Sequence, residues 1–488
     1  MNYHSTLSTR TLMKLLGLGG IRRGSRGTGS AFHDIDEAIS SPLAEWKRPW
    51  WVKLVNNPTV EIDWDRMQRF DGRKMMQVSF VDYVGKDRNR YLRDHRNKKT
   101  RQWILEKKSG YTLADRALDL AGRTGTVDPT FLGAWKKSTH IGGVWAGHIF
   151  GPDELNVPRW NGSPEENALL VRAAIRHFGA DQVGFVELNE RTRKLIYSYD
   201  ALDGKAIMFE EVDEAYETEK RRVIPNKAQW VIVFSVQMSE EQIKLMIESS
   251  PTPLASAATG LAYARARNIL ERLQNFLHLL GYQGLMGTWY NGLGIAPALG
   301  VMGGLGELGR TNRIISPEYG PLQRVFKVIT DLPLAPTQPI DAGIMEFCRT
   351  CKKCAEACPS GALSMEPEPS WEVKGPWNHP GVRAYFDDGP RCYSYWLTAT
   401  ASCARCFAVC PFSTKQKSFV HKLVMATLAV TPLLNPVFAY MHTVFGYGAS
   451  RQPASWWDCD LPPYGIDTAR AIAWDKRLGR TKTASPRR

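Results

Sequence analysis

The sequence predicts an α+β fold in which a cysteine-rich module follows a larger mixed domain. Three observations predict it. Helix and buried-strand patterns alternate between residues 161 and 340, eight of the nine cysteines lie between Cys348 and Cys410, and 43% of the 488 residues are hydrophobic. A chain of this length and composition has room for roughly two to four globular domains.

The mixed domain is predicted to begin with a helix after Ser163. Ser163 is a suitable N-cap, Pro164 suits the first helical position, and Glu166 completes a capping box. Apolar runs of strand length follow at Val183 to Leu188 and at Trp230 to Val236, and they indicate buried strands.

A second long helix is predicted from Leu261 to Leu280, where Gly281 ends it. A strand follows at Arg324 to Ile329. The proline-rich segment Asp331 to Pro339 then predicts an extended linker that leads into the cysteine-rich module.

Three closely spaced cysteines occur in each of two motifs that end in Cys-Pro. The motifs are Cys348-x2-Cys351-x2-Cys354-x3-Cys358-Pro359 and Cys392-x10-Cys403-x2-Cys406-x3-Cys410-Pro411. In the ferredoxin run of this type, three thiolates hold one [4Fe–4S] cluster and the fourth cysteine crosses to the other cluster. The crossing rule predicts two ligand sets: Cys348, Cys351, Cys354 and Cys410, and Cys392, Cys403, Cys406 and Cys358.

Zinc and disulfides explain these cysteines less well. Zinc ribbons use cysteine pairs but lack the third close cysteine and the Cys-Pro ending. A disulfide scaffold distributes its cysteines through a small secreted domain. The pattern therefore favours two iron–sulfur clusters that transfer electrons singly, and the preceding domain is expected to bind their acceptor. Cys459 is expected to be a buried structural thiol.

The net charge of +14 suits nucleic acid, an anionic membrane surface or an acidic redox partner, and charge alone does not choose. The basic run from Lys86 to Lys108 is interpreted as a solvated surface insertion. No apolar stretch is long enough to span a bilayer, which needs ~20 residues. The best candidate, Leu423 to Leu434, is broken by Pro432 and predicts one or two buried helices.

The N-terminal segment His4 to Gly20 resembles a twin-arginine export leader. Thr9 and Arg10 stand where two arginines are expected, and a basic stretch replaces the small apolar run that should follow. We interpret residues 1–30 as an altered Tat-like leader.

The glycines Gly304, Gly306 and Gly309 match the pattern GxGxxG. Pro297 and Gly300 stand where a dinucleotide-binding fold should place a strand, so the match is weak. We expect these glycines instead to bring backbone close to a large ligand, because glycine has no Cβ.

These motifs resemble those of the corrinoid-dependent reductive dehalogenases of organohalide-respiring bacteria. The resemblance covers nearly the whole chain, and the spaced second cysteine motif is its sharpest feature. The other segments that carry it are Phe32–Glu37, Trp50–Val52, Trp160–Gly179, Leu280–Tyr282, Gly304–Arg310, Thr330–Pro336, Pro339–Gly343 and Phe445–Gly448.

The resemblance implies a nitroreductase-like domain that binds a cobamide, with a ferredoxin-like module of two [4Fe–4S] clusters docked against it. The domains expected are the leader (1–30), an N-terminal region packing on the core (31–160), the cobamide-binding domain (161–340), the ferredoxin-like domain (341–420) and a C-terminal extension (421–488).

The resemblance also implies roles for single residues. Tyr263 falls at the proton donor, Arg324 at the basic residue beside it, and Asn291 at a polar residue of the pocket. By residue type alone, Tyr263 is a packing residue and Arg324 a rim charge. The three glycines are expected at the cobamide, and Trp396 in the aromatic wall of the substrate pocket.

The implied activity is reductive dehalogenation, in which hydrogen replaces a halogen of an organic compound. Electrons reach cobalt through the two clusters and reduce it to Co(I), which attacks the halogen or the carbon, or transfers an electron. A tyrosine can supply the proton that the product needs, and a guanidinium stabilises the phenolate left behind. No protein histidine is implied as the lower cobalt ligand.

The implied partners are a halogenated organic substrate, a small integral-membrane anchor subunit and an upstream electron donor, with no nucleic acid. The implied location is the outer face of the cytoplasmic membrane. Two alternatives stay open: an enzyme like epoxyqueuosine reductase, which acts on transfer RNA, and a non-catalytic electron carrier. Corrinoid content distinguishes the carrier, which needs only clusters.

Overall fold

The computed structural model describes residues 51–113, 131–132, 151–153, 158–247, 250–287, 292–413, 419–444, 453 and 456–457. These residues belong to one compact unit, Trp51–Cys459. The predicted leader, Asn291 and Cys459 lie outside the described residues. The five domain boundaries stay a prediction.

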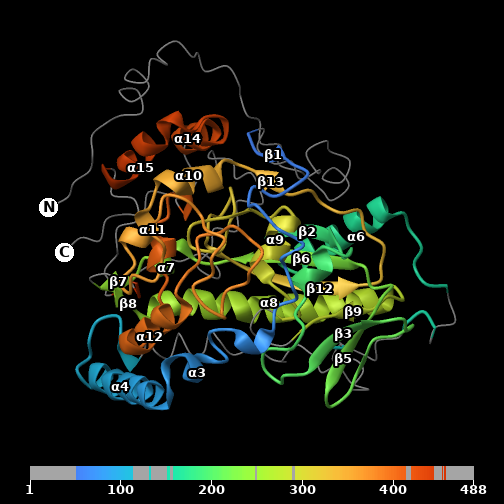
Figure 1. Ribbon diagram of the computed structural model, residues 1–488, viewed down its shortest axis with the longest axis horizontal. Coiled ribbons are helices and arrows are strands. Elements are labelled where there is room, and N and C mark those ends of the chain that lie inside the picture. The colour runs from blue at the N-terminus through green and yellow to red at the C-terminus, as the bar shows by residue number, and fades with distance from the viewer. Residues whose placement is uncertain are drawn as a thin grey trace, which may run out of the picture. The chain divides into compact units, whose positions relative to one another are not determined.

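A four-stranded antiparallel sheet forms the centre of the mixed domain (Figure 1). Its strands, in spatial order, are β2 (Gln182–Glu187), β6 (Trp230–Gln237), β12 (Gln323–Thr330) and β9 (Gly284–Leu285). The three predicted strands are therefore confirmed to within one residue at each end. β6 reads as a continuous apolar run because both faces of the sheet are covered.

Helices α6 (Pro164–His177) and α8 (Pro253–Leu279) cover one face of this sheet. The predicted capping box of α6 is present, since the Ser163 side chain accepts from the Glu166 amide and the Glu166 carboxylate accepts from the Ser163 amide. α8 begins eight residues before the predicted start at Leu261. Its first two turns are rich in small residues and give no amphipathic signal, although the Thr252 side chain caps them.

Helix α9 (Ala296–Met302) packs on the opposite face, beside the hairpin of β10 (Glu307–Leu308) and β11 (Ile314–Ile315). The GxGxxG segment leads into this hairpin and not from a strand into a helix, so it is not a dinucleotide-binding turn. A smaller sheet of β3 (Ala206–Glu210), β5 (Arg221–Pro225) and β4 (Tyr216–Glu217) lies beyond it.

Short elements contain or flank the cysteines. They are α10 (Ile344–Thr350), α11 (Lys353–Glu356), α12 (Gly389–Ala399), α13 (Arg405–Ala408) and η4 (Pro411–Ser413). The ten-residue segment that separates Cys392 from Cys403 is helical as far as Ala399. The Asp388 side chain caps this helix by accepting from the Arg391 amide, and Thr400 ends it with a φ of +65°.

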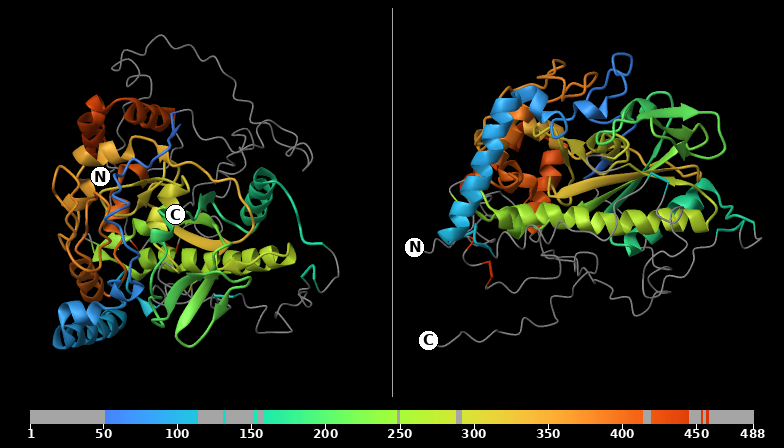
Figure 2. Two further views of the ribbon diagram at one scale, coloured as in Figure 1. Left: turned by 45° about the vertical axis from the view of Figure 1, so that its right-hand side comes forward. Right: turned by 90° about the horizontal axis from the view of Figure 1, so that it is seen from below.

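The N-terminal part of the unit packs along both domains. β1 (Lys53–Leu54) pairs with β13 (Ile340–Asp341) at the linker. The basic run forms α4 (Lys86–Leu105), which lies at the edge of the molecule in Figure 2 and buries Leu92 against α12. The remaining short elements are η1 (Gly72–Lys74), α3 (Phe80–Val84), η3 (Thr192–Leu195), α7 (Glu240–Ile243), β7 (Met246–Ile247) and β8 (Ser250–Pro251).

The predicted C-terminal helices are α14 (Phe419–Val430) and α15 (Asn435–Val444), joined by η5 (Pro432–Leu434). They are only partly buried: one side packs on α10, and the other exposes large apolar side chains. Among the described residues, no single helix is long and apolar enough to cross a membrane. The pair formed by α14 and α15 is long and apolar enough only when the two helices are counted together, and the chain bends by 119° at the break between them.

Candidate functional site

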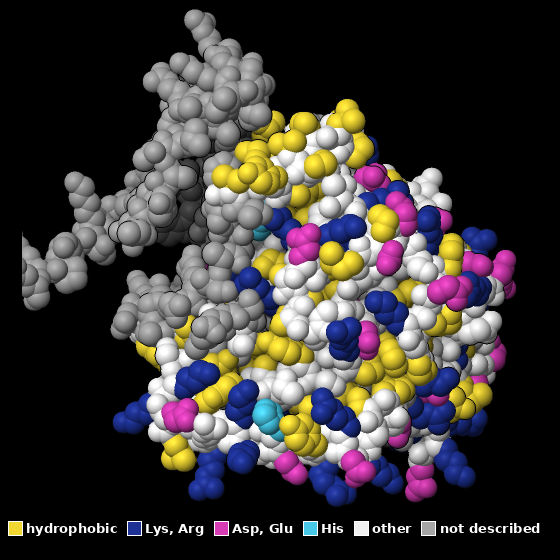
Figure 3. Space-filling view, turned by 60° about the vertical axis from the view of Figure 1, so that its left-hand side comes forward, with side chains coloured by type: hydrophobic (Ala, Val, Ile, Leu, Met, Phe, Trp, Pro, Cys, Tyr) yellow, Lys and Arg dark blue, Asp and Glu magenta, His cyan; other side chains and the backbone are white. Residues whose placement is uncertain are grey.

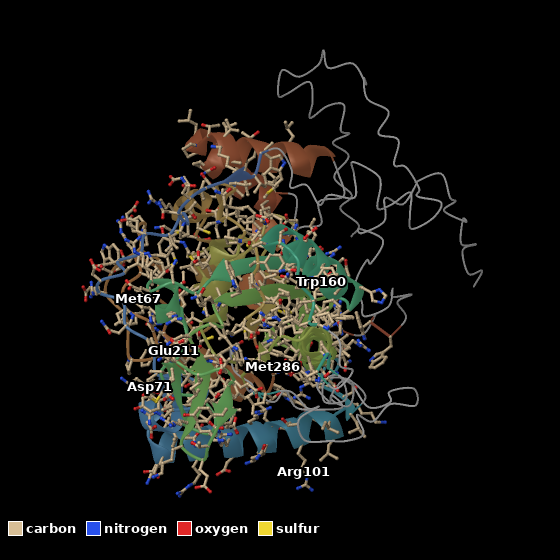
Figure 4. The ribbon with its side chains drawn as sticks, turned by 90° about the vertical axis from the view of Figure 1, so that its right-hand side faces the viewer. Met67, Asp71, Arg101, Trp160, Glu211 and Met286 are labelled. Carbon is tan, nitrogen blue, oxygen red and sulfur yellow. The ribbon has the colours of Figure 1, made fainter. Side chains whose placement is uncertain are left out.

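A cavity of about 1690 Å³, counted with the space open to solvent, lies between the mixed domain and the cysteine module. The N-terminal segment around Met67, labelled in Figure 4, forms one side, and α9 forms another. Aromatic side chains make up much of the wall: Phe70, Tyr197, Tyr263, Trp377, Phe386 and Phe407. The cavity is thus a large, mainly apolar site.

Tyr263 and Arg324 meet at this cavity, as the sequence prediction requires. Tyr263 lies on α8 and Arg324 on β12, and the packing of these elements places the guanidinium carbon 5.7 Å from the centroid of the tyrosine ring. Arg324 Nη2 donates to Thr259 Oγ1 at 3.2 Å, and Thr259 stands one helical turn before Tyr263. The Phe326 ring meets the tyrosine edge-on at 5.5 Å and fixes its orientation.

Three polar side chains, those of Asn312, Arg313 and Asp387, form the side of the cavity that faces the cysteine module. Asn312 Nδ2 donates to Asp387 Oδ1 at 3.1 Å, and Arg313 Nη2 contacts Asp387 Oδ2 at 3.2 Å. All three residues line the cavity. The Asp387 carboxylate raises the pKa of Arg313, so this cation is firmly charged beside Cys392 and Cys406.

The residues present fit a corrinoid, whose ring is broad and apolar and carries amide side chains at its rim. Gln323 lines the cavity, and its buried Oε1 has no hydrogen-bond partner in the structure. Because a buried acceptor is normally satisfied, this atom suits an amide donor from a ligand. His379, also in the wall, has its Nε2 2.8 Å from the Gln68 carbonyl.

The cysteines fall into two spatial groups. After burial, the charges of neighbouring cysteines raise the pKa of Cys354 and Cys410, and these neighbours include Cys348 and Cys351, with Cys406 also in reach. Cys358 acts in the same way on the other group, which comprises Cys392, Cys403 and Cys406. This grouping is compatible with the two sets that the crossing rule gives, and the ligand sets stay a prediction.

Burial dominates the electrostatics of these thiols. It raises the pKa of Cys348, Cys392, Cys403 and Cys406 to about 12. Such thiols need a cation to become thiolates, and iron supplies that charge. Within the described residues, no three potential ligands converge as a single metal ion requires; thiolates around a cubane bind separate irons.

A small cavity of about 320 Å³ of non-protein space is bounded by Cys348, Cys351, Cys354 and Cys410. Arg310, only 1% exposed, holds one side of it. The guanidinium donates to the carbonyls of Cys348, Arg349, Ser364 and Glu366 at 2.6–3.1 Å. Sequence reasoning missed this residue because its partners come together only in the folded chain.

Glu307 was missed for the same reason. Its Oε1 accepts from the amides of Ala342 and Ile344, and its Oε2 accepts from Thr59 Oγ1 and the Met345 amide, at 2.6–3.3 Å. Burial raises the pKa of Glu307, while these donors oppose the rise. The carboxyl thus caps α10, the helix that carries Cys348.

The three glycines and Trp396 lie away from the large cavity. A Cβ on Gly304 would meet the Gln338 carbonyl at 2.2 Å and one on Gly306 the Ile315 carbonyl at 2.4 Å, so these glycines approach protein backbone. Gly309 lies against Cys348. Trp396 packs beside Tyr393 on α12 and is not among the described residues that line the cavity, whereas Trp377, which the sequence did not single out, is.

A large apolar cavity beside two groups of four cysteines defines an iron–sulfur oxidoreductase with a bulky cofactor or substrate. A family model described as "Reductive dehalogenase subunit" matches residues 47–334, and one for a "4Fe-4S double cluster binding domain" matches residues 347–413. The chain therefore belongs to the reductive dehalogenase family.

Curated relatives agree. The chain is 30% identical over 530 residues to the chloroethene reductive dehalogenase of Dehalococcoides mccartyi strain VS. This alignment covers 95% of this chain and 99% of the relative. It is 34% identical over 383 residues to the tetrachloroethene reductive dehalogenase of Sulfurospirillum multivorans, covering 74% and 73%.

Solved structures show the same fold. The catabolic reductive dehalogenase NpRdhA in complex with 3-bromo-4-hydroxybenzoic acid superposes with a TM-score of 0.57 at 19% identity, covering 81% of this chain and 49% of that one. A structure described as suggesting a mechanism for B12-dependent dehalogenation has a TM-score of 0.57, covering 89% and 54%. The chain thus spans about half the length of these solved proteins.

Proposed function

We propose that this protein removes a halogen from a small organic compound and replaces it with hydrogen, using a cobamide in the large cavity and electrons from two [4Fe–4S] clusters. The observation that carries this function is the meeting of Tyr263 and Arg324 at a cavity walled by the cysteine module. A corrinoid bound there would supply low-valent cobalt for cleavage of the carbon–halogen bond.

Tyr263 is proposed as the proton donor. Its hydroxyl-bearing ring lines the cavity, and the carbon that loses halide needs one proton to become the product. Arg324 is fixed by its hydrogen bond to Thr259 and stabilises the phenolate that proton transfer leaves. The product thus gains a proton from the protein and its two electrons from the clusters.

The electron path is proposed to run from the cluster of Cys348, through that of Cys392, to the cavity. Phe407 lines the cavity and directly follows Cys406, and Gly389 lines it three residues before Cys392. The second cluster is therefore the inner one. Cys406 also lies close enough to Cys354 and Cys410 for their charges to interact, so the two clusters are near neighbours.

A small chlorinated alkene is the proposed substrate class, because the matched curated relatives named above act on chloroethene and tetrachloroethene. The aromatic wall suits such apolar molecules. The test supplies cobamide-loaded protein with reduced viologen and compares chlorinated ethenes with halogenated phenols. Halide released faster from the phenols would contradict this substrate class.

The two alternatives have less support. A relative named epoxyqueuosine reductase, from Bacillus subtilis, is 26% identical over 170 residues and covers only 31% of this chain. An electron carrier needs no cavity beside its clusters. Corrinoid that copurifies with the protein in a ratio near one to one would separate the two corrinoid enzymes, the dehalogenase and the epoxyqueuosine reductase, from a bare carrier. Activity on transfer RNA would then separate these two enzymes.

The partner proposed for the C-terminal helices is a small integral-membrane subunit, which would hold the protein at the outer face of the cytoplasmic membrane. Hydrophobic side chains gather at the top of Figure 3, over α14 and α15. The exposed members are Val430, Leu433, Leu434, Val437, Tyr440 and Val444, and we call them the C-terminal apolar face. We also propose that the central sheet with α8 and α9 is of the nitroreductase type.

A further inference from the structure

The hydroxyl group of Thr311 lies at the cavity of the outer cluster without a partner. Thr311 lines this cavity together with Cys348, Cys351, Cys354 and Cys410. Its side chain is 3% exposed, and its buried Oγ1 makes no hydrogen bond in the structure. A buried hydroxyl is normally hydrogen-bonded, because desolvation without compensation is costly. The partner is therefore to be sought among the atoms that fill the cavity.

The backbone around Thr311 is held rigidly on both sides. Arg310 is tied to four carbonyl groups, two of them on Cys348 and Arg349 of the neighbouring helix end, and its guanidinium stacks on the Tyr385 ring at 4.0 Å. Asn312, with a φ of +54°, donates to Asp387. The backbone at Thr311 is therefore held in place beside the cavity.

The backbone from Gly309 to Thr311 also runs close to Cys348. A Cβ on Gly309 would lie 3.6 Å from Cys348 Sγ, and the Arg310 backbone amide hydrogen-bonds to that thiol. The segment from Gly309 to Thr311 thus forms one wall of the outer-cluster cavity. A hydroxyl in such a wall meets sulfur, because a cubane presents sulfide and thiolate at its surface.

We propose that Thr311 donates its hydroxyl hydrogen to a sulfur of the [4Fe–4S] cluster held by Cys348, Cys351, Cys354 and Cys410, and thereby raises the reduction potential of that cluster. An added electron makes the cluster more negative, so a hydrogen-bond donor stabilises the reduced form more than the oxidised form. Thr311 is then a tuning residue that makes the outer cluster a better electron acceptor from the upstream donor.

This inference rests on the cluster part of the proposed function and not on dehalogenation. The test is a potentiometric titration of cluster-loaded protein, followed by electron paramagnetic resonance. Thr311→Val keeps the side-chain shape and removes the hydroxyl, whereas Thr311→Ser keeps the hydroxyl. The control is Thr427→Val, which removes a hydroxyl on α14 that donates to the Leu423 carbonyl.

Thr311→Val is expected to lower the midpoint potential of one cluster and leave the other unchanged. Thr311→Ser and Thr427→Val are expected to stay at the wild-type value. An unchanged potential in Thr311→Val, or an equal fall in Thr427→Val, overturns the proposal. The outcome does not depend on whether any organohalide is turned over.

A second measurement covers the case in which Thr311→Val does not assemble its clusters. In heavy water, pulsed resonance of the reduced outer cluster should show an exchangeable deuteron, in addition to that of the Arg310 amide, that is present in wild type and Thr311→Ser and lost in Thr311→Ala. The same deuteron signal in Thr311→Ala would assign the coupling to backbone amides and overturn the proposal.

Discussion

Tyr263 on α8 and Arg324 on β12 are 61 positions apart in sequence (324 − 263), and only the packing of the helix on the strand gives them a shared role. Changing Tyr263 to Phe removes the hydroxyl but keeps the ring contact with Phe326. We expect turnover to fall by roughly 10²- to 10⁴-fold, the usual contribution of a general acid. Steady-state halide release measures this, with iron and corrinoid contents unchanged.

The matched control is Tyr282→Phe, just beyond the end of the same helix. The Tyr282 hydroxyl donates to the Trp160 carbonyl at 2.8 Å and does not line the large cavity. This variant should keep its turnover. If both variants lose activity equally, the effect is structural and Tyr263 is not the donor.

Lys327 predicts a pH dependence of stability. It lies on β12 with 6% of its surface exposed, and burial lowers its pKa to about 7. Between this value and the ordinary 10.5, the unfolded chain binds a proton that the folded chain does not, so folding stability rises with pH. Each pKa unit corresponds to about 1.4 kcal/mol, so the full effect is a few kcal/mol.

Chemical denaturation of wild type and Lys327→Met from pH 6.5 to 9.5 measures this dependence. The stability of wild type relative to the variant should increase steadily with pH. A difference that does not change with pH would mean that the ammonium stays charged, as it would beside an anionic group of a bound cofactor.

At the scale of single elements, Glu307 supports the helix that carries Cys348. Glu307→Ala leaves the amides of Ala342, Ile344 and Met345 without their acceptor. Because each buried unsatisfied group costs ~1–3 kcal/mol, we expect a loss on the order of 3 kcal/mol and faster release of iron from the outer cluster. Denaturation and iron-release kinetics measure both effects.

Glu346→Ala is the control on the same helix. Glu346 is half-exposed and pairs with Arg349 at 3.4 Å, a surface contact that contributes ~1 kcal/mol at most. Its removal should change neither quantity much. If Glu307→Ala and Glu346→Ala changed stability and iron release equally, Glu307 would not be the cap of α10.

The elements themselves were largely predictable because their signals are local. The capping box at Ser163 and the apolar run of β6 depend on adjacent residues, and both are found in the structure. The start of α8 was not predictable, since its small residues are buried on all sides. The segment after Cys392 forms helix α12 because Asp388 caps it, a signal that the cysteine spacing obscured.

The candidate site was predictable only in part. Resemblance to the family led to Tyr263 and Arg324, whereas residue type alone indicated a packing residue and a rim charge. Asn312 and Arg313 contact Asp387, which lies about 75 positions later in the sequence, and together they form one side of the cavity. No local sequence pattern predicts such a contact. Gly304 was assigned to a ligand, but its missing Cβ makes room for the Gln338 carbonyl.

At the scale of the whole molecule, the C-terminal apolar face predicts membrane association. Leu433 is 83% exposed, and Val437 lies one helical turn later. The double variant Leu433→Glu with Val437→Glu should shift the protein from the membrane to the soluble fraction when the native membrane subunit is present. Fractionation with immunodetection measures this.

Leu169→Glu is the control, because Leu169 is an exposed leucine on α6, outside the C-terminal apolar face. It should leave the distribution unchanged. If the double variant stays in the membrane fraction, attachment does not use the C-terminal helices.

The cavity beside the clusters is proposed to hold a corrinoid. Halide would be removed there with electrons from the two clusters. Halide release from tetrachloroethene tests it most directly, measured with reduced viologen on protein that carries its clusters, with and without bound cobamide. We expect steady halide release with cobamide and none without it. Equal rates with and without cobamide would contradict it.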